Sequence, residues 1–189
     1  MARDGTKTRE RIRREALRLF VEQGVDGTTT RDIAEACAMS EGNLYRHFEG
    51  KEDLAWILFR DNYAALAGEL EQAIGEGGDA ATTLRRIVAL LCRLFDEEPF
   101  RFRYLLLSQH NHLNRVSDDT AGPFAVLRAY FEARIAAKEV AVGPATLATA
   151  LSIAPVIQVA TALVYGELPG PLSRWCDPIT DATLRGLSL

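Results

Sequence analysis

Cysteine is scarce in this 189-residue chain, and its placement does not suggest a disulfide framework. The three residues, Cys37, Cys92 and Cys176, are an odd number, lie far apart and show no C-x-x-C spacing. Such a pattern favours a reducing compartment. The basic N-terminal stretch MARDGTKTRERIRR also lacks the apolar segment of a secretory signal peptide. We therefore expect a cytoplasmic protein.

The chain also lacks any sustained alternation of apolar and polar residues, so no segment is predicted as a β-strand. Internal repeats and low-complexity tracts are absent from the sequence as well. Apolar residues recur instead at helical spacing, as at Ile12, Ala16, Leu19 and Phe20. Hydrophobic residues make up 48% of the chain, enough for an ordinary globular protein to bury a core. The predicted fold class is all-α.

An excess of positive charge is missing too, since the net charge is −4. The distribution of charge is uneven, however. Residues 1–20 carry a local positive excess, residues 1–60 balance at 11 basic and 11 acidic groups, and residues 61–189 carry 11 basic and 15 acidic groups. This pattern suits a DNA-binding head on an acidic body. Ordinary variation of surface charge explains the same numbers, so charge alone leaves both interpretations open.

Start and stop signals divide the chain into about nine helices. Thr8 is the expected N-cap of the first helix and Gly24 its expected C′ residue, while Pro99 and Pro144 occupy the first position of two later helices. The glycine-rich stretch GEGGDA at 75–80 interrupts the pattern. The predicted helices cover roughly residues 8–23, 29–37, 40–48, 50–74, 80–96, 99–113, 118–138, 144–165 and 178–187.

Two short helices with a tight connection follow the first amphipathic helix, which is the order of a helix-turn-helix. Thr29 caps the first of them, with Asp32 completing a capping box, and Ser40 caps the second. On the second helix Leu44 and Phe48 are four residues apart and point to the core. The exposed faces are left to polar residues and a glycine, namely Glu41, Gly42, Asn43, Arg46 and His47.

These exposed residues have the chemistry for contacts with duplex DNA. Asn43 carries both a donor and an acceptor and can pair with adenine, and Gly42 lets the backbone come close. Tyrosine, histidine and lysine side chains suit phosphate contacts, which position a protein without reading sequence. The alternative is a small helical bundle whose polar surface has no binding role. The predicted DNA-binding residues are Thr29, Thr30, Arg31, Gly42, Asn43, Tyr45, His47 and Lys51.

The stretch TRERIRREALRLFVEQGVDGTTTRDIAEACAMSEGNLYRHFEGKEDL closely resembles the N-terminal domain of the TetR family of bacterial transcriptional regulators. The matching elements are A-L-R-L-F, E-Q-G, T-T-T-R-D-I-A, S-x-G-N-L-Y-x-H-F and K-E-D-L. The resemblance implies an all-helical homodimer that binds a near-palindromic operator, usually represses, and releases DNA when a small molecule enters the C-terminal domain. It also implies DNA contacts at the eight positions named above, with phosphate contacts at His47 and Lys51.

Two positions depart from the family pattern. Ala38 stands in the turn where family members usually have glycine, and alanine is strained there by about 1 kcal/mol if the backbone needs positive φ. Gly50 replaces the serine often found before the lysine, which costs roughly a few tenths of a kcal/mol at an N-cap. Neither departure removes the expected helix-turn-helix.

The C-terminal part of the sequence is less informative. A small-molecule site is expected to be a mostly apolar cavity with a few polar groups. His110 and His112 are two residues apart, so a helix does not present both to one metal, and Ser108 lacks an acidic partner or an elbow motif. No metal, cofactor or catalytic residue is predicted. Candidates to line a ligand cavity, each of which is also explained as a core or surface residue, are Tyr104, Gln109, His112, Gln158, Tyr165 and Trp175.

The segment from Val140 to Gly166 contains no charged residue. A membrane-spanning helix is one explanation. Ser152, Pro155 and Gln158 lie within it, however, and its flanks show no excess of positive charge on one side. A helix that is apolar all round in a chain of this size needs a second subunit to cover it. We therefore predict a dimer helix and no membrane contact.

The resulting prediction is an all-α homodimer, with a helix-turn-helix DNA-binding domain at 1–50 and a helical ligand-binding and dimerisation domain at 51–189. The expected function is a ligand-responsive transcriptional regulator, a repressor rather than an enzyme. One alternative is an activator or chromosome-organising protein of the same fold without ligand release, which a ligand that leaves DNA affinity unchanged would favour. The other is an enzyme or carrier, which an absence of sequence-selective DNA binding would favour.

Overall fold

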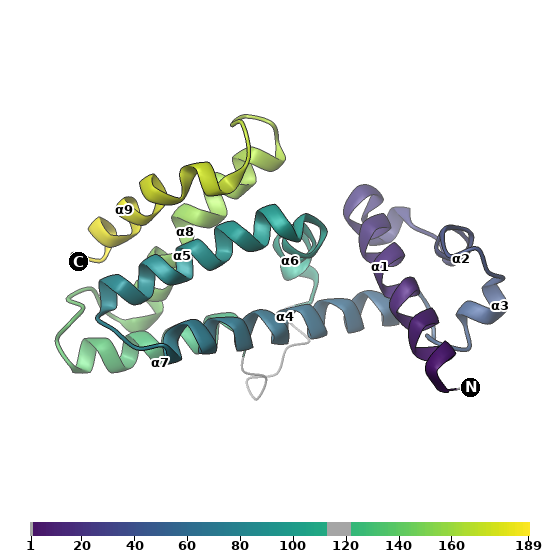
Figure 1. The fold of residues 1–189 in the computed structure, drawn as a ribbon, viewed down its shortest axis with the longest axis horizontal. Helices are drawn as coiled ribbons and strands as arrows, with labels where there is room; N and C mark the ends of the chain where they lie inside the picture. Colours follow the sequence, from purple (N-terminus) through teal and green to yellow (C-terminus); the bar gives the residue numbers. More distant parts are fainter. Residues whose placement is uncertain (1, 113–121) are drawn as a thin grey trace. The chain divides into compact units, whose positions relative to one another are not determined.

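The fold is shown in Figure 1 as a computed structural model, which describes residues 2–112 and 122–189. Every regular element in these ranges is helical, so the all-α prediction is confirmed. The elements are α1 (Ala2–Gly27), α2 (Thr30–Ala36), α3 (Glu41–Leu44), α4 (Lys51–Gly75), α5 (Ala80–Glu97), α6 (Pro99–His112), α7 (Pro123–Ala136), α8 (Ala145–Val164), the 3-10 helix η2 (Leu172–Trp175) and α9 (Cys176–Gly186).

The described chain divides into two compact units. Unit 1 comprises residues 2–62 and 103–112, and unit 2 comprises residues 63–102 and 122–189. The border falls inside α4 and inside α6, so both of these helices contribute to both units. The functional division into residues 1–50 and 51–189 stays a prediction, because these units are defined by contacts alone.

The apolar face of α1 forms the centre of unit 1, as its helical spacing predicts. Ile12 is fully buried and Phe20 is 4% exposed. Tyr104, from α6, stacks on Phe20 with ring centroids 6.1 Å apart, and its hydroxyl donates a hydrogen bond to the Ala55 carbonyl at 2.8 Å. Burial of this phenol raises the pKa of Tyr104. The packing joins α1, α4 and the second half of α6 into one core.

Helix α1 is longer than predicted at both ends. It begins at Ala2, so Thr8 lies inside the helix and the prediction that it is the N-cap was wrong. No proline precedes Thr8 to stop the helix from extending towards the N-terminus. Near the other end Gly24 has φ 77 and ψ 160, a conformation that L side chains rarely adopt, and helix then continues to Gly27. The predicted stop at Gly24 is therefore a kink, and the Thr28 hydroxyl donates to the Gly24 carbonyl at 2.7 Å.

The later helices begin close to where proline and glycine predict. Pro99 starts α6 as expected, but Pro144 is the N-cap residue of α8 and not its first helical residue. Helix α7 has Gly122 as its N-cap and Pro123 at its first position, whereas the predicted start at residue 118 lies outside the described residues. The C-terminal helix was predicted from residue 178, but η2 leads directly into α9 at Cys176.

Unit 2 is built around α8, which packs against α5, α7 and α9. Ala148, Val156 and Ala160 on its inner face are completely buried. Within the part of the chain that the structure describes, α8 is the one helix long and apolar enough to cross a membrane, by length and composition only. One face of α8 packs against these three helices, and 28% of its apolar window is buried. The opposite face is uncovered, since Leu147 is 44% and Tyr165 is 72% exposed.

Candidate nucleic-acid interface

Hydrogen-bonded caps fix the start of α2 and α3. The Thr29 hydroxyl accepts the backbone N–H of Asp32 at 3.1 Å, and the Asp32 carboxylate accepts the Thr29 hydroxyl at 2.7 Å and its backbone N–H at 2.8 Å. This is the predicted capping box. The bonds from the Thr29 side chain and backbone lower the pKa of Asp32. Ser40 caps α3 by accepting the N–H of Asn43 at 3.3 Å.

The turn between α2 and α3 depends on one residue with positive φ. Ala38 has φ 50, the conformation for which glycine is the usual choice, so the strain of about 1 kcal/mol considered for this alanine applies. Cys37, just before it, is 1% exposed, and burial raises the pKa of its thiol. The N–H of Met39 donates to the Ala34 carbonyl at 3.0 Å and closes the turn. The short connection therefore holds α2 and α3 in a fixed arrangement.

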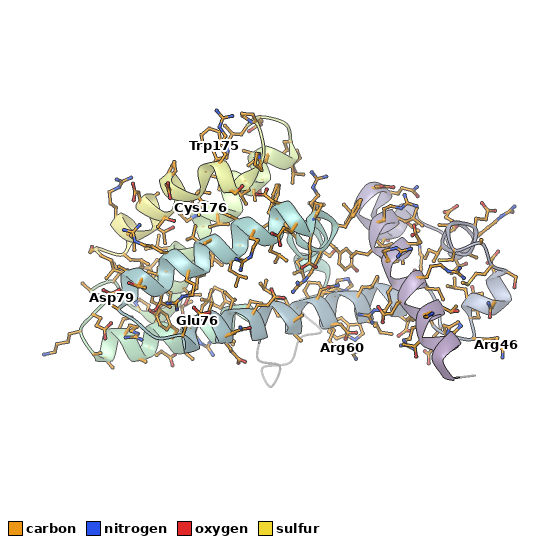
Figure 2. The ribbon with its side chains drawn as sticks, viewed as in Figure 1. Arg46, Arg60, Glu76, Asp79, Trp175 and Cys176 are labelled. Atoms are coloured by element: carbon orange, nitrogen blue, oxygen red, sulfur yellow. The ribbon has the colours of Figure 1, made fainter. Side chains whose placement is uncertain are left out.

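Residues 40–48 form the recognition segment. Its apolar side chains are buried in unit 1 and its polar side chains lie towards the surface, as predicted. Leu44 is 3% and Phe48 is 4% exposed, whereas Tyr45 is 53% exposed. The helix ends at Leu44 and not near Phe48, because the N–H groups of Arg46 and His47 bond to carbonyls three residues back and tighten the chain into a turn. Asn43 and His47 are partly exposed, and Glu41, Gly42 and Arg46, the last marked in Figure 2, are exposed.

Two candidate DNA contacts at the start of α2 have acidic partners. The Thr30 hydroxyl donates to the Glu41 carboxylate at 3.1 Å, which links α2 to α3. Arg31 forms an ion pair with Glu35 at 2.9 Å, and the hydrogen bond that Arg31 donates to this carboxylate raises the pKa of Arg31. Both side chains of that pair are largely exposed, and such pairs contribute little to stability. A phosphate group could therefore replace Glu35 as the partner of Arg31 at low cost.

Lys51 joins α4 to the end of α1. Its ammonium donates to the carbonyls of Val25 at 3.0 Å, Asp26 at 3.2 Å and Thr28 at 2.9 Å. An ammonium has three N–H donors, and a cation at the end of α1 also favours the helix dipole. These contacts give Lys51 a structural role between α1 and α4. Its phosphate contact stays a prediction.

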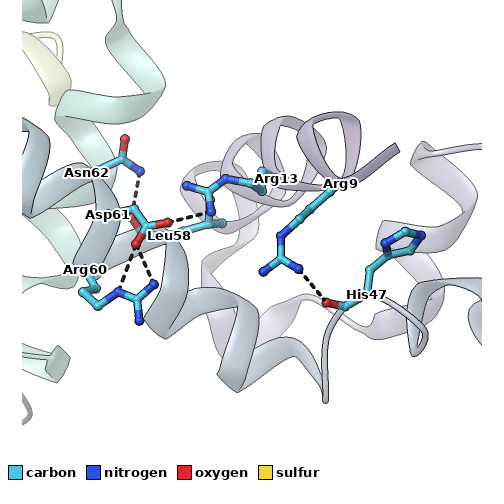
Figure 3. Close-up of polar contacts among 7 residues, drawn as sticks. All are labelled: Arg9, Arg13, His47, Leu58, Arg60, Asp61 and Asn62. Carbon is cyan, nitrogen blue, oxygen red and sulfur yellow. Dashed lines mark hydrogen bonds and ion pairs between the residues drawn. The ribbon is translucent and has the colours of Figure 1, made fainter. Parts of the chain in front are cut away.

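Arg9 joins α1 to the end of the recognition segment, as Figure 3 shows. Its guanidinium lies over the Phe48 ring, 4.7 Å from the centroid, and donates to the His47 carbonyl at 3.4 Å. This contact of Arg9 with the end of the recognition segment was not predicted from the sequence. A signal was present, because Arg9 and Arg13 are four residues apart and share one face of α1.

Arg13 makes the neighbouring connection from α1 to α4. It pairs with Asp61 at 2.7 Å, and Asp61 also accepts from Arg60 at 2.8 Å (Figure 3). Burial alone would raise the pKa of Asp61, but the hydrogen bonds from Arg60 and Arg13 outweigh burial and lower it. These contacts fix the outer helices of unit 1 around the candidate interface.

The candidate ligand residues are divided between the two units. Tyr104 lies in the core of unit 1 with its hydroxyl already bonded to a backbone carbonyl. His112, also in unit 1, is 8% exposed and lies beside the rings of Trp56 and Phe59, with centroid distances of 6.0 and 4.9 Å. The side chain of Gln109 lies outside the described part of the structure.

The other three candidates belong to unit 2 and lie towards its surface. Gln158 and Tyr165 are exposed residues at α8. Trp175 is partly exposed at the end of η2 (Figure 2), and its indole N–H donates to the Pro169 carbonyl at 3.0 Å. A sequence shows where aromatic and amide side chains occur. It does not show which of their polar atoms form hydrogen bonds with backbone groups.

A hollow of about 330 Å³ in unit 2 lies between the C-terminal half of α4 and α5. None of the six candidates lines it, and its charged lining differs from the mostly apolar wall expected for an effector site. Among the described residues, no group of three or more histidine, cysteine or acidic side chains is placed to hold a metal ion. The lining residues are Glu69, Gln72, Ala73, Glu76, Arg86, Ala89, Leu90, Arg93, Leu94, Glu97 and Glu98.

Comparison with known proteins agrees with this geometry. Residues 12–55 match the model of the tetR family of bacterial regulatory proteins. The HTH-type transcriptional repressor KstR2 of Rhodococcus jostii is 37% identical over 73 residues, which cover 39% of this chain. The match spans 36% of the length of that repressor, so the two chains are related over only part of their lengths.

Solved structures share the fold over nearly the whole chain. The fatty acid degradation regulator FadR from Bacillus halodurans has a TM-score of 0.80 at 17% identity, covering 93% of this chain and 94% of that one. FadR from Bacillus subtilis, in complex with stearoyl-CoA, has a TM-score of 0.75 at 18% identity, covering 94% and 98%. These identities support likeness of fold alone. Residues 12–55 therefore form an N-terminal helix-turn-helix domain of the tetR family of bacterial regulatory proteins.

Proposed function

We propose that the protein is a cytoplasmic transcriptional regulator that binds a near-palindromic DNA operator as a homodimer. The observation that carries the proposal is the arrangement of the recognition segment. Leu44 and Phe48 anchor it in the core of unit 1, while Asn43, Tyr45 and Arg46 face outwards to different degrees. In a helix-turn-helix this is the face that enters the major groove.

The two kinds of DNA contact divide among these residues by their chemistry. Asn43 is proposed to contact a base edge, because its amide presents a donor and an acceptor together. Thr29, Thr30, Arg31 and Tyr45 are proposed to contact phosphates and so to set the position of α3 in the groove. Arg9 and Lys51 contribute within unit 1 by holding α1 against His47, which follows α3, and against the start of α4.

The uncovered face of α8 supports the homodimer. Leu147, Ala150, Ala154 and Gln158 are exposed and recur at helical spacing. Three of these four side chains are apolar, and the two alanines would let a partner helix approach closely. A second copy of the same face would remove this apolar surface from water, and a two-fold axis would match the symmetry of a palindromic operator.

Repression and ligand release are the proposed mode of regulation. The relative KstR2 is a repressor, and FadR of Bacillus subtilis binds stearoyl-CoA. Long-chain acyl-CoA is therefore the first effector class to test here. A ligand that binds better to the conformation unsuited to DNA would shift the population away from the operator complex, and operator and ligand would weaken each other's binding equally.

In-vitro selection from a random DNA pool, with purified protein at near-physiological salt, tests the DNA-binding proposal. We expect a palindromic motif with half-sites about one helical turn apart. The Asn43→Ala variant, run in parallel, should lose preference at one position of each half-site. Recovery of no motif by the wild-type protein would overturn sequence-specific regulation and favour an enzyme or carrier. A motif whose binding no acyl-CoA weakens would leave the DNA proposal standing and remove this effector class.

A further inference from the structure

Two of the three cysteines lie together where α5 meets α9 in unit 2. Cys92 is on α5 and is 1% exposed, and Cys176 is the first residue of α9 and is partly exposed. Cys176 lies near enough to Cys92 to contribute to the raised pKa of that thiol, and both thiols are free in this structure. The pair could not be predicted from the sequence, because the two residues are far apart and follow no spacing pattern.

A second set of bonds holds the same two segments together. Asp96 lies one helical turn after Cys92, and its carboxylate accepts the N–H groups of Leu172 at 2.7 Å and Ser173 at 2.9 Å. These residues begin η2, which continues directly into α9 at Cys176 (Figure 2). The Asp96 side chain therefore joins the same two segments that carry the thiols, independently of the thiol side chains themselves.

The two thiols differ in their access to solvent. Burial raises the pKa of Cys92 to about 12, with a further contribution from the neighbouring Cys176. Cys92 is therefore a protonated and shielded thiol at neutral pH. Cys176 is the thiol that a small oxidant in solution reaches first.

We propose that oxidation by a hydroperoxide converts Cys92 and Cys176 into a reversible disulfide that links α5 to α9. The Cys176 thiolate attacks a peroxide oxygen, the O–O bond breaks, and with one proton a water molecule leaves, so that Cys176 becomes a sulfenic acid. Cys92 then loses its proton and attacks the Cys176 sulfur, the S–O bond breaks and a second water leaves. Two thiols and one hydrogen peroxide thus give one disulfide and two waters, and the two electrons lost by sulfur reduce the peroxide.

Cys37 provides an internal control within the same chain. It is 1% exposed in unit 1, and burial raises the pKa of its thiol. No other cysteine belongs to unit 1, since Cys92 and Cys176 are both in unit 2. Cys37 should therefore stay reduced under conditions that oxidise the pair.

The test treats the full-length protein with hydrogen peroxide, blocks the remaining thiols by alkylation under denaturing conditions, and maps the peptides by mass spectrometry without reduction. We expect alkylation at Cys37 alone, a cross-linked peptide that contains Cys92 and Cys176, and loss of that cross-link after dithiothreitol. Alkylation of all three cysteines, a disulfide between two chains, or a sulfinic acid at Cys176 with Cys92 still free would overturn the proposal.

Two variants separate the roles of the thiols. The Cys37→Ala variant should give the same cross-linked peptide as the wild-type protein. The Cys92→Ala variant removes the resolving thiol, so Cys176 should persist as a sulfenic acid that dimedone labels. Absence of dimedone label on a folded Cys92→Ala variant, checked by circular dichroism, would show that Cys176 is not the first site of oxidation. None of these readouts depends on DNA binding, so failure here leaves the proposed function untouched.

Discussion

The two units use their polar side chains in opposite ways. In unit 1 the threonine and serine hydroxyls at Thr29 and Ser40 cap helices at the surface and leave a polar face exposed beside them. In unit 2 the hydroxyls of Thr149, Ser152 and Thr183 are buried and donate to carbonyls three or four residues back in their own helices. The capped surface of unit 1 therefore leaves polar groups exposed beside the caps, whereas these three hydroxyls of unit 2 are satisfied within their own helices.

The largest expected effect tests the packing side of this comparison. Leu84 is fully buried in the core cluster of unit 2, together with Phe131 and Ala148. Leu84→Ala should lower the free energy of unfolding by about 2–5 kcal/mol, because it leaves a cavity among rigid neighbours. Leu107→Ala, at a leucine that is 50% exposed, is the control and should change stability by less than about 0.5 kcal/mol. Urea unfolding measures both, and equal effects would mean that unit 2 does not depend on this core.

A smaller loss of stability is expected when Lys51, which joins α4 to the end of α1, is substituted. Lys51→Met removes three charge-assisted hydrogen bonds to the carbonyls at residues 25, 26 and 28, and should destabilise the protein by about 1.5–3 kcal/mol. Lys7→Met, at an exposed lysine on α1, should leave stability unchanged. Thermal unfolding followed by circular dichroism gives both values.

The dependence of DNA affinity on salt then separates a structural role of Lys51 from a phosphate contact. Removing a phosphate contact reduces the slope of log affinity against log salt by about 0.9. We expect the folded Lys51→Met variant to keep the wild-type slope, because its ammonium is directed to the end of α1. A reduced slope would restore the phosphate contact that the sequence predicts.

The sequence predicts unit 1 well where the interacting residues are close along the chain. The capping box of Thr29 and Asp32 and the cap of Ser40 each join residues three positions apart, so pattern alone identifies them. The inward position of Leu44 and Phe48 follows from helical spacing in the same way. The recognition surface is therefore largely a local property of the sequence.

Contacts between distant residues account for what the sequence did not predict. The bond from Tyr104 to the Ala55 carbonyl joins positions 49 apart, and no periodicity marks Ala55 as a partner. Tyr104 was therefore a candidate cavity residue on sequence alone, and in the structure it is a core residue. The carbonyls that receive Lys51 are equally hidden, because backbone acceptors carry no sequence identity. The role of the candidate ligand residues stays a prediction, since a cavity is a product of long-range packing.

An intermediate effect on recognition, with none on folding, is expected at the exposed face of unit 1. Asn43→Ala should cost about 1–3 kcal/mol of discrimination at one base pair and leave the free energy of unfolding unchanged. Tyr45→Phe, which removes only a hydroxyl, should weaken binding evenly across sequences. Binding to the selected operator and to single-base variants of it measures both. Loss of discrimination by Tyr45→Phe alone would exchange the proposed roles of these residues.

The smallest expected effect uses acid to compare the caps of the two units. Asp32 in unit 1 and Asp79 in unit 2 both have a lowered pKa, because each carboxylate accepts hydrogen bonds, from Thr29 and from Thr82 respectively. A carboxyl group whose pKa is lower in the folded than in the unfolded state adds stability above the unfolded value, near 3.8, and loses it as pH falls through the lowered folded value. The contribution of these two carboxylates to the free energy of unfolding should therefore be constant from pH 7 to 5 and decrease below about pH 4.

Substitution by asparagine shows whether that acid loss belongs to one unit or to both. Asp32→Asn and Asp79→Asn should each show a smaller drop in stability between pH 5 and pH 3 than the wild-type protein, because the substituted amide does not titrate in that range. The caps lie in separate units with no shared partner, so the two reductions should add in the double variant. A double variant with the full acid sensitivity of the wild-type protein would mean that other carboxylates, such as Asp61 with its arginine partners, govern acid unfolding, and that the surface caps of unit 1 matter for geometry alone.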